Sequence, residues 1–281
     1  MRTVYITFTY STFRLFFEDD ILAVNFATTF QASPTSAKIG VHYIDVIGNG
    51  ATNYSIFLNG LLIQEAVLRS EVVYYITRVF GETICAGARG AICVFHAAST
   101  IIRGNRIVSF FGSSGSGKTT LSLYFSKYGY FIGDEYAYID LNTGFLWHEQ
   151  HPFQLKKSNA TSILDDLSSP AVLAVQGFPF GQAYYASLAF TNHKTVKHSD
   201  RIKVKVMVLP RYDSSIEDTR ICKLRISELP SVVLQSLMGE STPSILFKRF
   251  IQMASSEHVQ FYEVKFSDGI DAAKQLFSQI K

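Results

Sequence analysis

The segment Gly112–Thr119 limits the possible folds of this chain more than any other feature. Its sequence, GSSGSGKT, fits the pattern G-x-x-x-x-G-K-[ST] of a phosphate-binding P-loop. The apolar run 106–111 before it resembles a buried strand, and the run 120–127 after it resembles a helix. Because a P-loop joins a strand to a helix, this context predicts an α/β fold with a site for nucleotide phosphates.

Each part of the loop has its own expected task. The glycines leave the backbone free to turn successive N–H groups toward an anion. Lys118 is expected to reach the β- and γ-phosphates, and the Thr119 hydroxyl to bind Mg²⁺. Thr120 either assists or faces along the helix. The expected nucleotide-binding residues are Gly112, Ser113, Ser114, Gly115, Ser116, Gly117, Lys118, Thr119 and Thr120.

Two adjacent acids follow the expected helix. We expect Gly129 to end that helix as its C-cap, and the apolar segment 130–133 to form a short strand that ends at Asp134 and Glu135. Alternation along a strand would point the two carboxylates to opposite sides, with one facing the phosphates. Asp134 would then hold Mg²⁺ or accept a proton from an attacking hydroxyl. From spacing alone, a solvated turn explains these residues equally well.

The segment 110–122, followed by Phe131–Glu135, resembles the nucleotide site of the phosphoenolpyruvate carboxykinase superfamily. It also resembles the protein-kinase branch of that superfamily, the bacterial HPr serine kinase/phosphorylases and their stand-alone relatives. The shared features are a hydroxyl residue after the P-loop lysine, a short helix, and an apolar strand that ends in two acids. The resemblance is specific from His96 to about Asp140 and diffuse elsewhere.

The resemblance implies ATP- and Mg²⁺-dependent kinase chemistry, with Lys118 on the phosphates. It implies that Asp134 contacts the metal and acts as the base toward an acceptor hydroxyl, with Thr119 and Glu135 as further metal ligands. Glu135 departs from the second aspartate that is usual in the kinases. His96 matches a histidine that many kinase-like members place near the transferred phosphoryl group. A buried histidine that only satisfies its neighbours is the alternative.

The implied acceptor is a serine-like hydroxyl of a peptide, a protein or a small molecule. A carboxykinase-type enzyme is less expected, because those chains are much longer than the 281 residues present here. No clear copy of the substrate segment of HPr kinases follows the two acids. A nucleotide-binding regulatory or scaffold protein without phosphotransfer is therefore the alternative.

Composition excludes several other classes of protein. A chain with 47% hydrophobic and only 17% charged residues is not disordered, and with 14% aromatic residues it favours an apolar surface that packs against a second copy. A net charge of +3 without a Lys/Arg cluster disfavours nucleic-acid binding. No apolar run reaches the ~18 residues of a membrane span. Without C-x-x-C spacing, Cys85, Cys93 and Cys222 favour a reducing cytoplasm.

The chain is expected to have two parts. Residues 1–89 are predicted to form a β-rich N-terminal region with one helix, and residues 90–281 a P-loop kinase-like core with a helical C-terminal part. Within the first part, 1–10 alternates like a strand, Asn59-Gly60 predicts a hairpin turn, and 64–80 has helical periodicity.

A Gly-Asn turn at 104–105 predicts an antiparallel hairpin that leads into the P-loop strand. Mixed, partly antiparallel sheets of this kind agree with a carboxykinase-like architecture. Farther along, Gly177–Gly181 is expected to be an aromatic loop, either against a ligand or as a buried turn. Arg211 is a candidate for charge at the phosphates. Helices are expected at 244–253 and 271–280, around a strand at 259–265.

Overall fold

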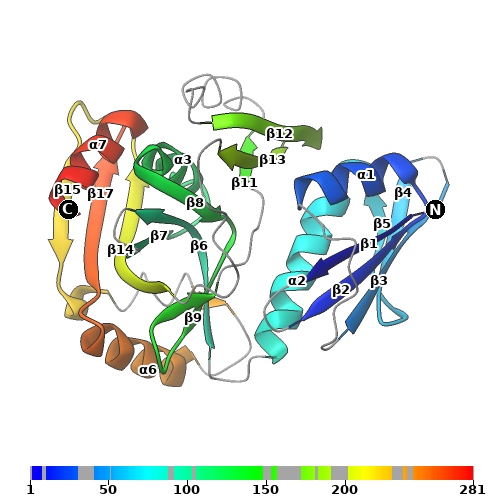
Figure 1. Ribbon diagram of the computed structural model, residues 1–281, viewed down its shortest axis with the longest axis horizontal. Coiled ribbons are helices and arrows are strands. Elements are labelled where there is room, and N and C mark those ends of the chain that lie inside the picture. The colour runs from blue at the N-terminus through cyan, green and yellow to red at the C-terminus, as the bar shows by residue number, and fades with distance from the viewer. Residues whose placement is uncertain are drawn as a thin grey trace. The chain divides into compact units, whose positions relative to one another are not determined.

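The computed structural model describes residues 2–7, 11–30, 41–50, 52–87, 92–102, 106–147, 153–156, 172–180, 183–190, 202–229, 237–238 and 243–280. These residues form a mixed α/β structure with a five-stranded, a nine-stranded and a three-stranded sheet, so the α/β class with mixed sheets is confirmed (Figure 1). Tertiary contacts divide the chain into two compact units.

Unit 1 is built on the five-stranded sheet, whose order is that of the chain. The strands are β1 (Arg2–Thr7), β2 (Thr12–Phe17), β3 (Val41–Gly48), β4 (Asn53–Leu58) and β5 (Leu61–Leu68). The 3-10 turn η1 (Arg69–Glu71) leads from β5 into helix α2 (Val72–Gly87), and helix α1 (Asp20–Thr29), which was not predicted, follows β2. Strands β12 (Val172–Phe180) and β13 (Ala183–Phe190) also belong to this unit, and β11 (Phe153–Lys156) pairs with β13.

The core of unit 1 lies between one face of its sheet and the two helices. Alternate residues of β2, namely Phe13, Leu15 and Phe17, are fully buried. The ring of Phe13 lies 4.5 Å from that of Phe80 on α2, and the ring of Phe17 lies 5.4 Å from that of Phe26 on α1. The period of two along β2 therefore sets which face of the sheet the helices cover.

Two sequence predictions in this unit are confirmed. Residues Arg2–Thr7 form strand β1, and Asn59-Gly60 joins β4 to β5 with positive φ at both positions, 51° and 79°. Such a turn suits the twist of two antiparallel strands, and Asn and Gly tolerate it best.

Two other predictions fail, the first of them only in part, because residues 72–80 of the helix predicted over 64–80 do form α2. Residues 64–68 lie in β5, not in a helix, because hydrogen bonds to β4 outweigh their helical periodicity, and α2 begins only at Val72. Residues 177–180 are not a loop but the end of β12, where Phe178 pairs with Tyr185 and Pro179 with Tyr184. Pro179 is tolerated because β12 is an edge strand of its sheet. Gly181 lies outside the described residues.

Unit 2 contains the nine-stranded sheet, in the order β10-β9-β6-β7-β14-β17-β15, with β8 and β16 also paired to β6. Its elements are β6 (Ile92–Ile102), β7 (Arg106–Phe111), α3 (Lys118–Phe125), η2 (Ser126–Tyr128), β8 (Gly129–Gly133), β9 (Tyr136–Asp140), β10 (Phe145–Trp147), β14 (Ile202–Tyr212), β15 (Arg220–Leu224), η3 (Ile226–Glu228), β16 (Leu237–Met238), α6 (Pro243–Ser256), β17 (Gln260–Phe266) and α7 (Gly269–Ile280). The expected C-terminal helices and the strand between them are confirmed.

The expected hairpin into the P-loop strand is also confirmed. Strands β6 and β7 are antiparallel, with Ile101 opposite Ile107 and Ile102 opposite Arg106. Strand β14 is parallel to both β7 and β17, so the sheet is mixed. Strand β6 pairs with β9 along its first half and with β7 along its second, and β14 likewise pairs first with β10. Two long strands, β6 and β14, therefore each pair with different neighbours along their two halves.

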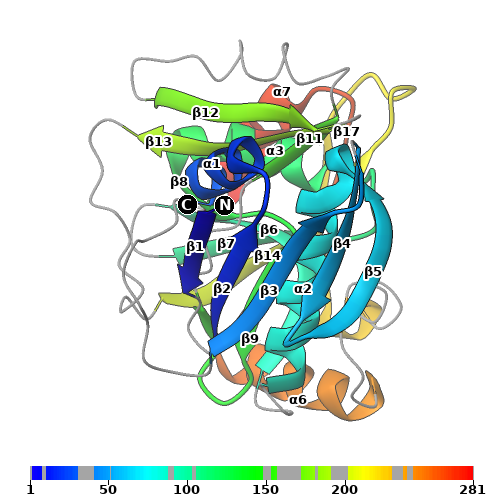
Figure 2. The same cartoon turned by 90° about the vertical axis from the view of Figure 1, so that its right-hand side faces the viewer.

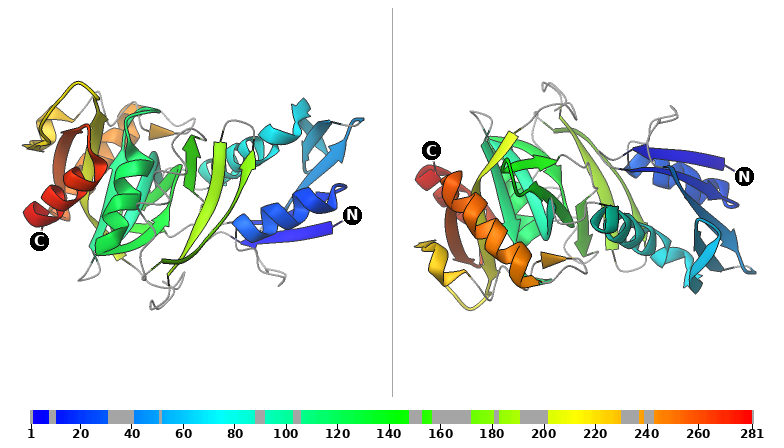
Figure 3. Two further views of the ribbon diagram at one scale, coloured as in Figure 1. Left: turned by 90° about the horizontal axis from the view of Figure 1, so that it is seen from above. Right: turned by 90° about the horizontal axis from the view of Figure 1, so that it is seen from below.

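Helices cover both faces of this sheet (Figures 1 and 3). On one face, α6 packs on a buried cluster, where the ring of Phe250 lies 4.9 Å from that of Phe95. On the other face, Phe110 of β7 contacts Phe125 of α3, and Tyr128 stacks on Phe277 of α7 at 4.2 Å. Alternation along β7 explains the division, because Phe110 and Phe111 point to opposite faces. None of the helices in the described ranges is long and apolar enough to cross a membrane.

Candidate functional site

The P-loop lies between β7 and α3, as its sequence requires. Gly112, Gly115 and Gly117 all have positive φ, at 147°, 80° and 93°. Position 117 is restricted most, because a Cβ there would lie 2.7 Å from Cζ of Phe266, in addition to the strain of a left-handed backbone. The loop therefore depends on glycine at this position for both conformation and space.

The loop is attached to the ends of two neighbouring strands. The Tyr212 backbone N–H, at the end of β14, donates a hydrogen bond of 3.0 Å to the Ser116 carbonyl. A Cβ at Gly112 would lie 3.2 Å from Leu209 of the same strand. The parallel strands β7, β14 and β17 end at this edge of the sheet, which is where α/β proteins bind their ligands. Sequence reasoning missed Tyr212 and Phe266 as supports, since only long-range strand pairing brings them here.

Lys118 begins helix α3 with its side chain turned back into the loop. The residue is only 6% exposed, and its Nζ donates a hydrogen bond of 3.0 Å to the carbonyl oxygen of Ser113. Burial lowers the pKa of this ammonium group, while the carboxylates of Asp134 and Glu135 raise it. A cation held in this way suits an anion bound in the loop, because the anion would compensate the cost of burial.

Ser116 provides a second sign that the loop fits a phosphate. Within the described residues, its buried Oγ has no hydrogen-bond partner. A buried hydroxyl without a partner is costly, and a phosphate oxygen is a strong acceptor. The residues of the loop therefore fit a bound phosphate group.

Thr119 and Asp134 form a direct contact between α3 and the end of β8. The Thr119 hydroxyl donates a hydrogen bond of 2.8 Å to Oδ2 of Asp134, which is 1% exposed. A hydroxyl and a carboxylate are the hard oxygen donors that Mg²⁺ prefers. The described residues contain no group of three His, Cys, Asp or Glu side chains that could hold a metal ion. This pair therefore fits a magnesium ion that takes its other ligands from phosphate and water.

Strand alternation predicts that Glu135 points away from the loop, but the structure places its side chain toward His96 and Lys118. Its φ is 74°, and this left-handed backbone ends the alternation of β8. Its Oε2 lies 3.1 Å from Nε2 of His96 on β6, and its charge also acts on Lys118. His96 is half-buried on the otherwise buried strand β6 and contacts Glu135, so a histidine that only satisfies this neighbour stays the alternative to a place near the phosphoryl group. The structure thus brings together Lys118, Thr119, Asp134, Glu135 and His96.

Gly129 is not the C-cap of helix α3, which is Ser126; it is instead the C-cap of the 3-10 turn η2 that continues the helix, and its N–H donates to the Ser126 carbonyl. Helix α3 ends at Phe125, the turn η2 follows, and Gly129 begins β8 with an extended φ of −172°. A Cβ here would lie 1.8 Å from the Ile101 carbonyl oxygen of β6. Glycine is required because two backbones approach closely, and this approach fixes where β8, and so Asp134, lies.

Two further candidates, Arg211 and Thr120, are placed by their contacts with β17 and α7. Arg211 is exposed and forms an ion pair with Glu263 of β17. A Cβ at Gly269 would lie 3.4 Å from Cγ2 of Thr120, so the Thr120 methyl group lies toward the start of α7.

The comparisons with known proteins add no relative. No protein-family model matches the chain, and no curated protein matches it significantly.

Proposed function

We propose that unit 2 is a carboxykinase-like P-loop kinase core, and that the chain is an ATP- and Mg²⁺-dependent kinase. It transfers the γ-phosphoryl group to a serine-like hydroxyl of a peptide, a protein or a small molecule. The hydrogen bond between Thr119 and Asp134, beside the buried Lys118, carries the proposal. A P-loop alone binds phosphate in many classes of protein, whereas an acid beside it provides a base for transfer. The proposal implies a cytoplasmic protein.

The proposal gives a role to each residue of the site, and two roles to Asp134. Bound Mg²⁺·ATP would supply the γ-phosphoryl group and the divalent charge that offsets its negative charge. The Lys118 ammonium, now on the Ser113 carbonyl, would turn to the β- and γ-phosphate oxygens. Thr119 and Asp134 would hold the metal, and a carboxylate oxygen of Asp134 would accept the proton of the acceptor hydroxyl. His96, paired with Glu135, would lie near the transferred group.

The test is a matched pair of variants at position 119, together with Asp134→Asn. Thr119→Ser keeps the hydroxyl, and Thr119→Val keeps the shape without it. We expect Thr119→Ser to transfer phosphate from γ-³²P-labelled ATP to hydroxyl-bearing peptides and small molecules, and Thr119→Val to lose Mg²⁺-dependent transfer. Asp134→Asn should lower the transfer rate roughly 100- to 10,000-fold, the usual contribution of a positioned base.

Asp140→Asn is the control, because Asp140 lies at the end of the next strand, β9, and caps a turn there. It should leave transfer unchanged. Full transfer by Asp134→Asn would contradict the role of that carboxylate. Tight ATP binding without transfer to any acceptor would instead favour a regulatory or scaffold protein.

A further inference from the structure

The outer face of the five-stranded sheet in unit 1 carries exposed apolar side chains beside charged ones. Helices α1 and α2 cover the other face, and Figure 2 shows the outer face toward the viewer with α2 behind it. On β3, Ile44 and Val46 are buried toward the helices, so Val41, Tyr43 and Asp45 lie on the outer face. Tyr43 is 47% exposed and Val41 38%. A sheet face in water normally carries polar side chains, so this surface fits a partner.

A pocket of about 490 Å³ opens on this face, lined by Arg14, Phe16, Tyr43, Asp45, Asn59 and Gly60. The Arg14 guanidinium lies 5.9 Å from the centre of the Tyr43 ring. The side chains of Arg14 and Asp45 form no ion pair with each other, and the Asp45 carboxylate has no hydrogen bond or ion pair within the described part of the chain. The pocket therefore presents one cation and one anion, both available to a partner.

A protruding aliphatic side chain, that of Leu62, lies on the same face as the pocket. Leu62 is opposite Phe57, which is opposite Asp45, whereas Leu61 is opposite Leu58 and shares the helix-covered face of Ile44. Leu61, Leu62 and Ile63 follow Gly60 in the chain and are 71%, 51% and 44% exposed. They begin β5, which is an edge strand of the sheet. Charges and bulges protect the later part of this edge, at Glu65 and in the register shifts against β4, whereas Leu61 and Leu62 carry no charge. A hollow and a projection thus adjoin on one surface.

We propose that this surface is the contact between two copies of the chain in a symmetric homodimer. In a two-fold interface the same patch meets itself, so every feature must find its complement within the patch. Here Arg14 of one protomer would meet Asp45 of its partner, and Leu62 of one would enter the pocket of the other. The presence of both charges and of both shapes on one patch favours a second copy over a foreign protein. This proposal is independent of the proposed kinase activity.

The experiment measures the dimer dissociation constant of the full chain by analytical ultracentrifugation over a range of concentrations. Arg14→Asp and Asp45→Arg each place like charges together at two symmetric contacts. Each variant alone should weaken the dimer at least about tenfold. An equimolar mixture of the two variants restores both opposite-charge contacts, so it should form a heterodimer with nearly the dissociation constant of the unmodified chain.

Lys223→Asp and Asp218→Arg are matched controls, because they reverse exposed charges in unit 2 and should not change the dissociation constant. Circular dichroism of all variants checks that they are folded. An unmodified chain that is monomeric at every concentration would overturn the proposal. A dimer that both single variants leave intact, or a mixture no tighter than either variant alone, would overturn it as well.

Discussion

At the scale of single residues, Gly129 and Gly117 limit the site more strictly than the charged side chains do. The first permits β8 to approach β6, and the second permits the loop to lie on Phe266. Neither requirement depends on a ligand. The positions of Asp134 and Lys118 therefore depend on the absence of a Cβ atom at residues 129 and 117.

Gly129→Ala tests this requirement. The added methyl group would lie 1.8 Å from the Ile101 carbonyl, which is a backbone atom that cannot rotate aside. We expect a loss of about 3 kcal/mol or more in the free energy of unfolding, as overpacking against backbone gives. Gly115→Ala is the control, since its φ is 80° but nothing lies within 4 Å of the new Cβ. It should cost only about 1–2 kcal/mol of backbone strain. Urea denaturation compares the two, and equal losses would contradict the argument.

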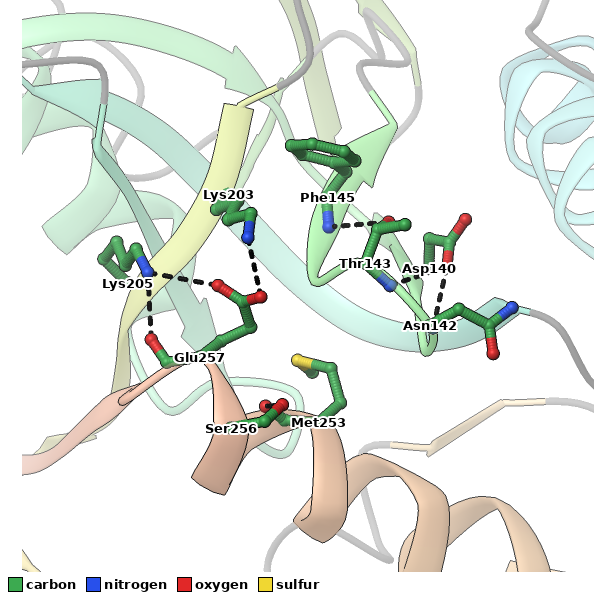
Figure 4. A network of polar contacts seen from close by, with 9 residues as sticks. All are labelled: Asp140, Asn142, Thr143, Phe145, Lys203, Lys205, Met253, Ser256 and Glu257. Carbon is green, nitrogen blue, oxygen red and sulfur yellow. Dashed lines mark hydrogen bonds and ion pairs between the residues drawn. The ribbon is translucent and has the colours of Figure 1, made fainter.

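At the scale of elements, an ion-pair network joins the C-terminus of α6 to β14 (Figure 4). Oε1 of Glu257 lies 2.6 Å from Nζ of Lys203, and its Oε2 lies 3.2 Å from Nζ of Lys205. Lys205 also donates to the Glu257 carbonyl oxygen at 2.9 Å. The hydrogen bond from Lys203, followed by that from Lys205, holds the pKa of the Glu257 carboxyl below its ordinary value. The network thus fastens the helix that covers the core of unit 2.

Glu257→Gln should make the contribution of this network visible through pH. Because the carboxyl has a lowered pKa in the folded chain, its stabilisation is fully present above the ordinary value of 4.5 and is lost as pH falls through the lower folded value. The variant should be less stable by about 1 kcal/mol at neutral pH, since both lysines are partly exposed. That difference should disappear at strongly acidic pH. Thermal unfolding across pH measures it, with the exposed Glu217→Gln as control. A difference that persists unchanged in acid would contradict the pKa argument.

Sequence reasoning succeeded where a few neighbouring residues decide the structure. The loop Gly112–Gly117, the turn at Asn59-Gly60 and the hairpin of β6 and β7 are local, so their residues alone predict them. It failed where another strand decides. Residues 64–68 form a strand because they pair with β4, although their own periodicity is helical. Glycine is required at position 129 because the backbone of β6 lies too close for a Cβ atom. The left-handed backbone at Glu135 has no local signal either.

At the scale of the whole molecule, each unit has its own buried core. In unit 1 the core is formed by residues such as Phe13 and Phe80, and in unit 2 by a cluster that includes Phe95, Phe111 and Phe250. All the residues of the candidate site that the structure brings together belong to unit 2. Nucleotide binding should therefore raise the free energy of unfolding of unit 2 more than that of unit 1.

Hydrogen exchange with and without Mg²⁺·ATP tests this expectation. A ligand that binds only the folded state adds about 2.7 kcal/mol of stability at a concentration of 100 times its dissociation constant. We expect slower exchange in β7, α3 and β8, which flank the loop, and little change in β1–β5. Lys118→Ala should abolish the protection, because it removes the cation expected at the phosphates. Thr77→Ala, which removes a buried hydroxyl of α2 in unit 1, should leave it intact. Equal protection of β1–β5 and β7 would mean that the two cores unfold together, and unchanged exchange in β7 and α3 would argue against nucleotide binding at this loop.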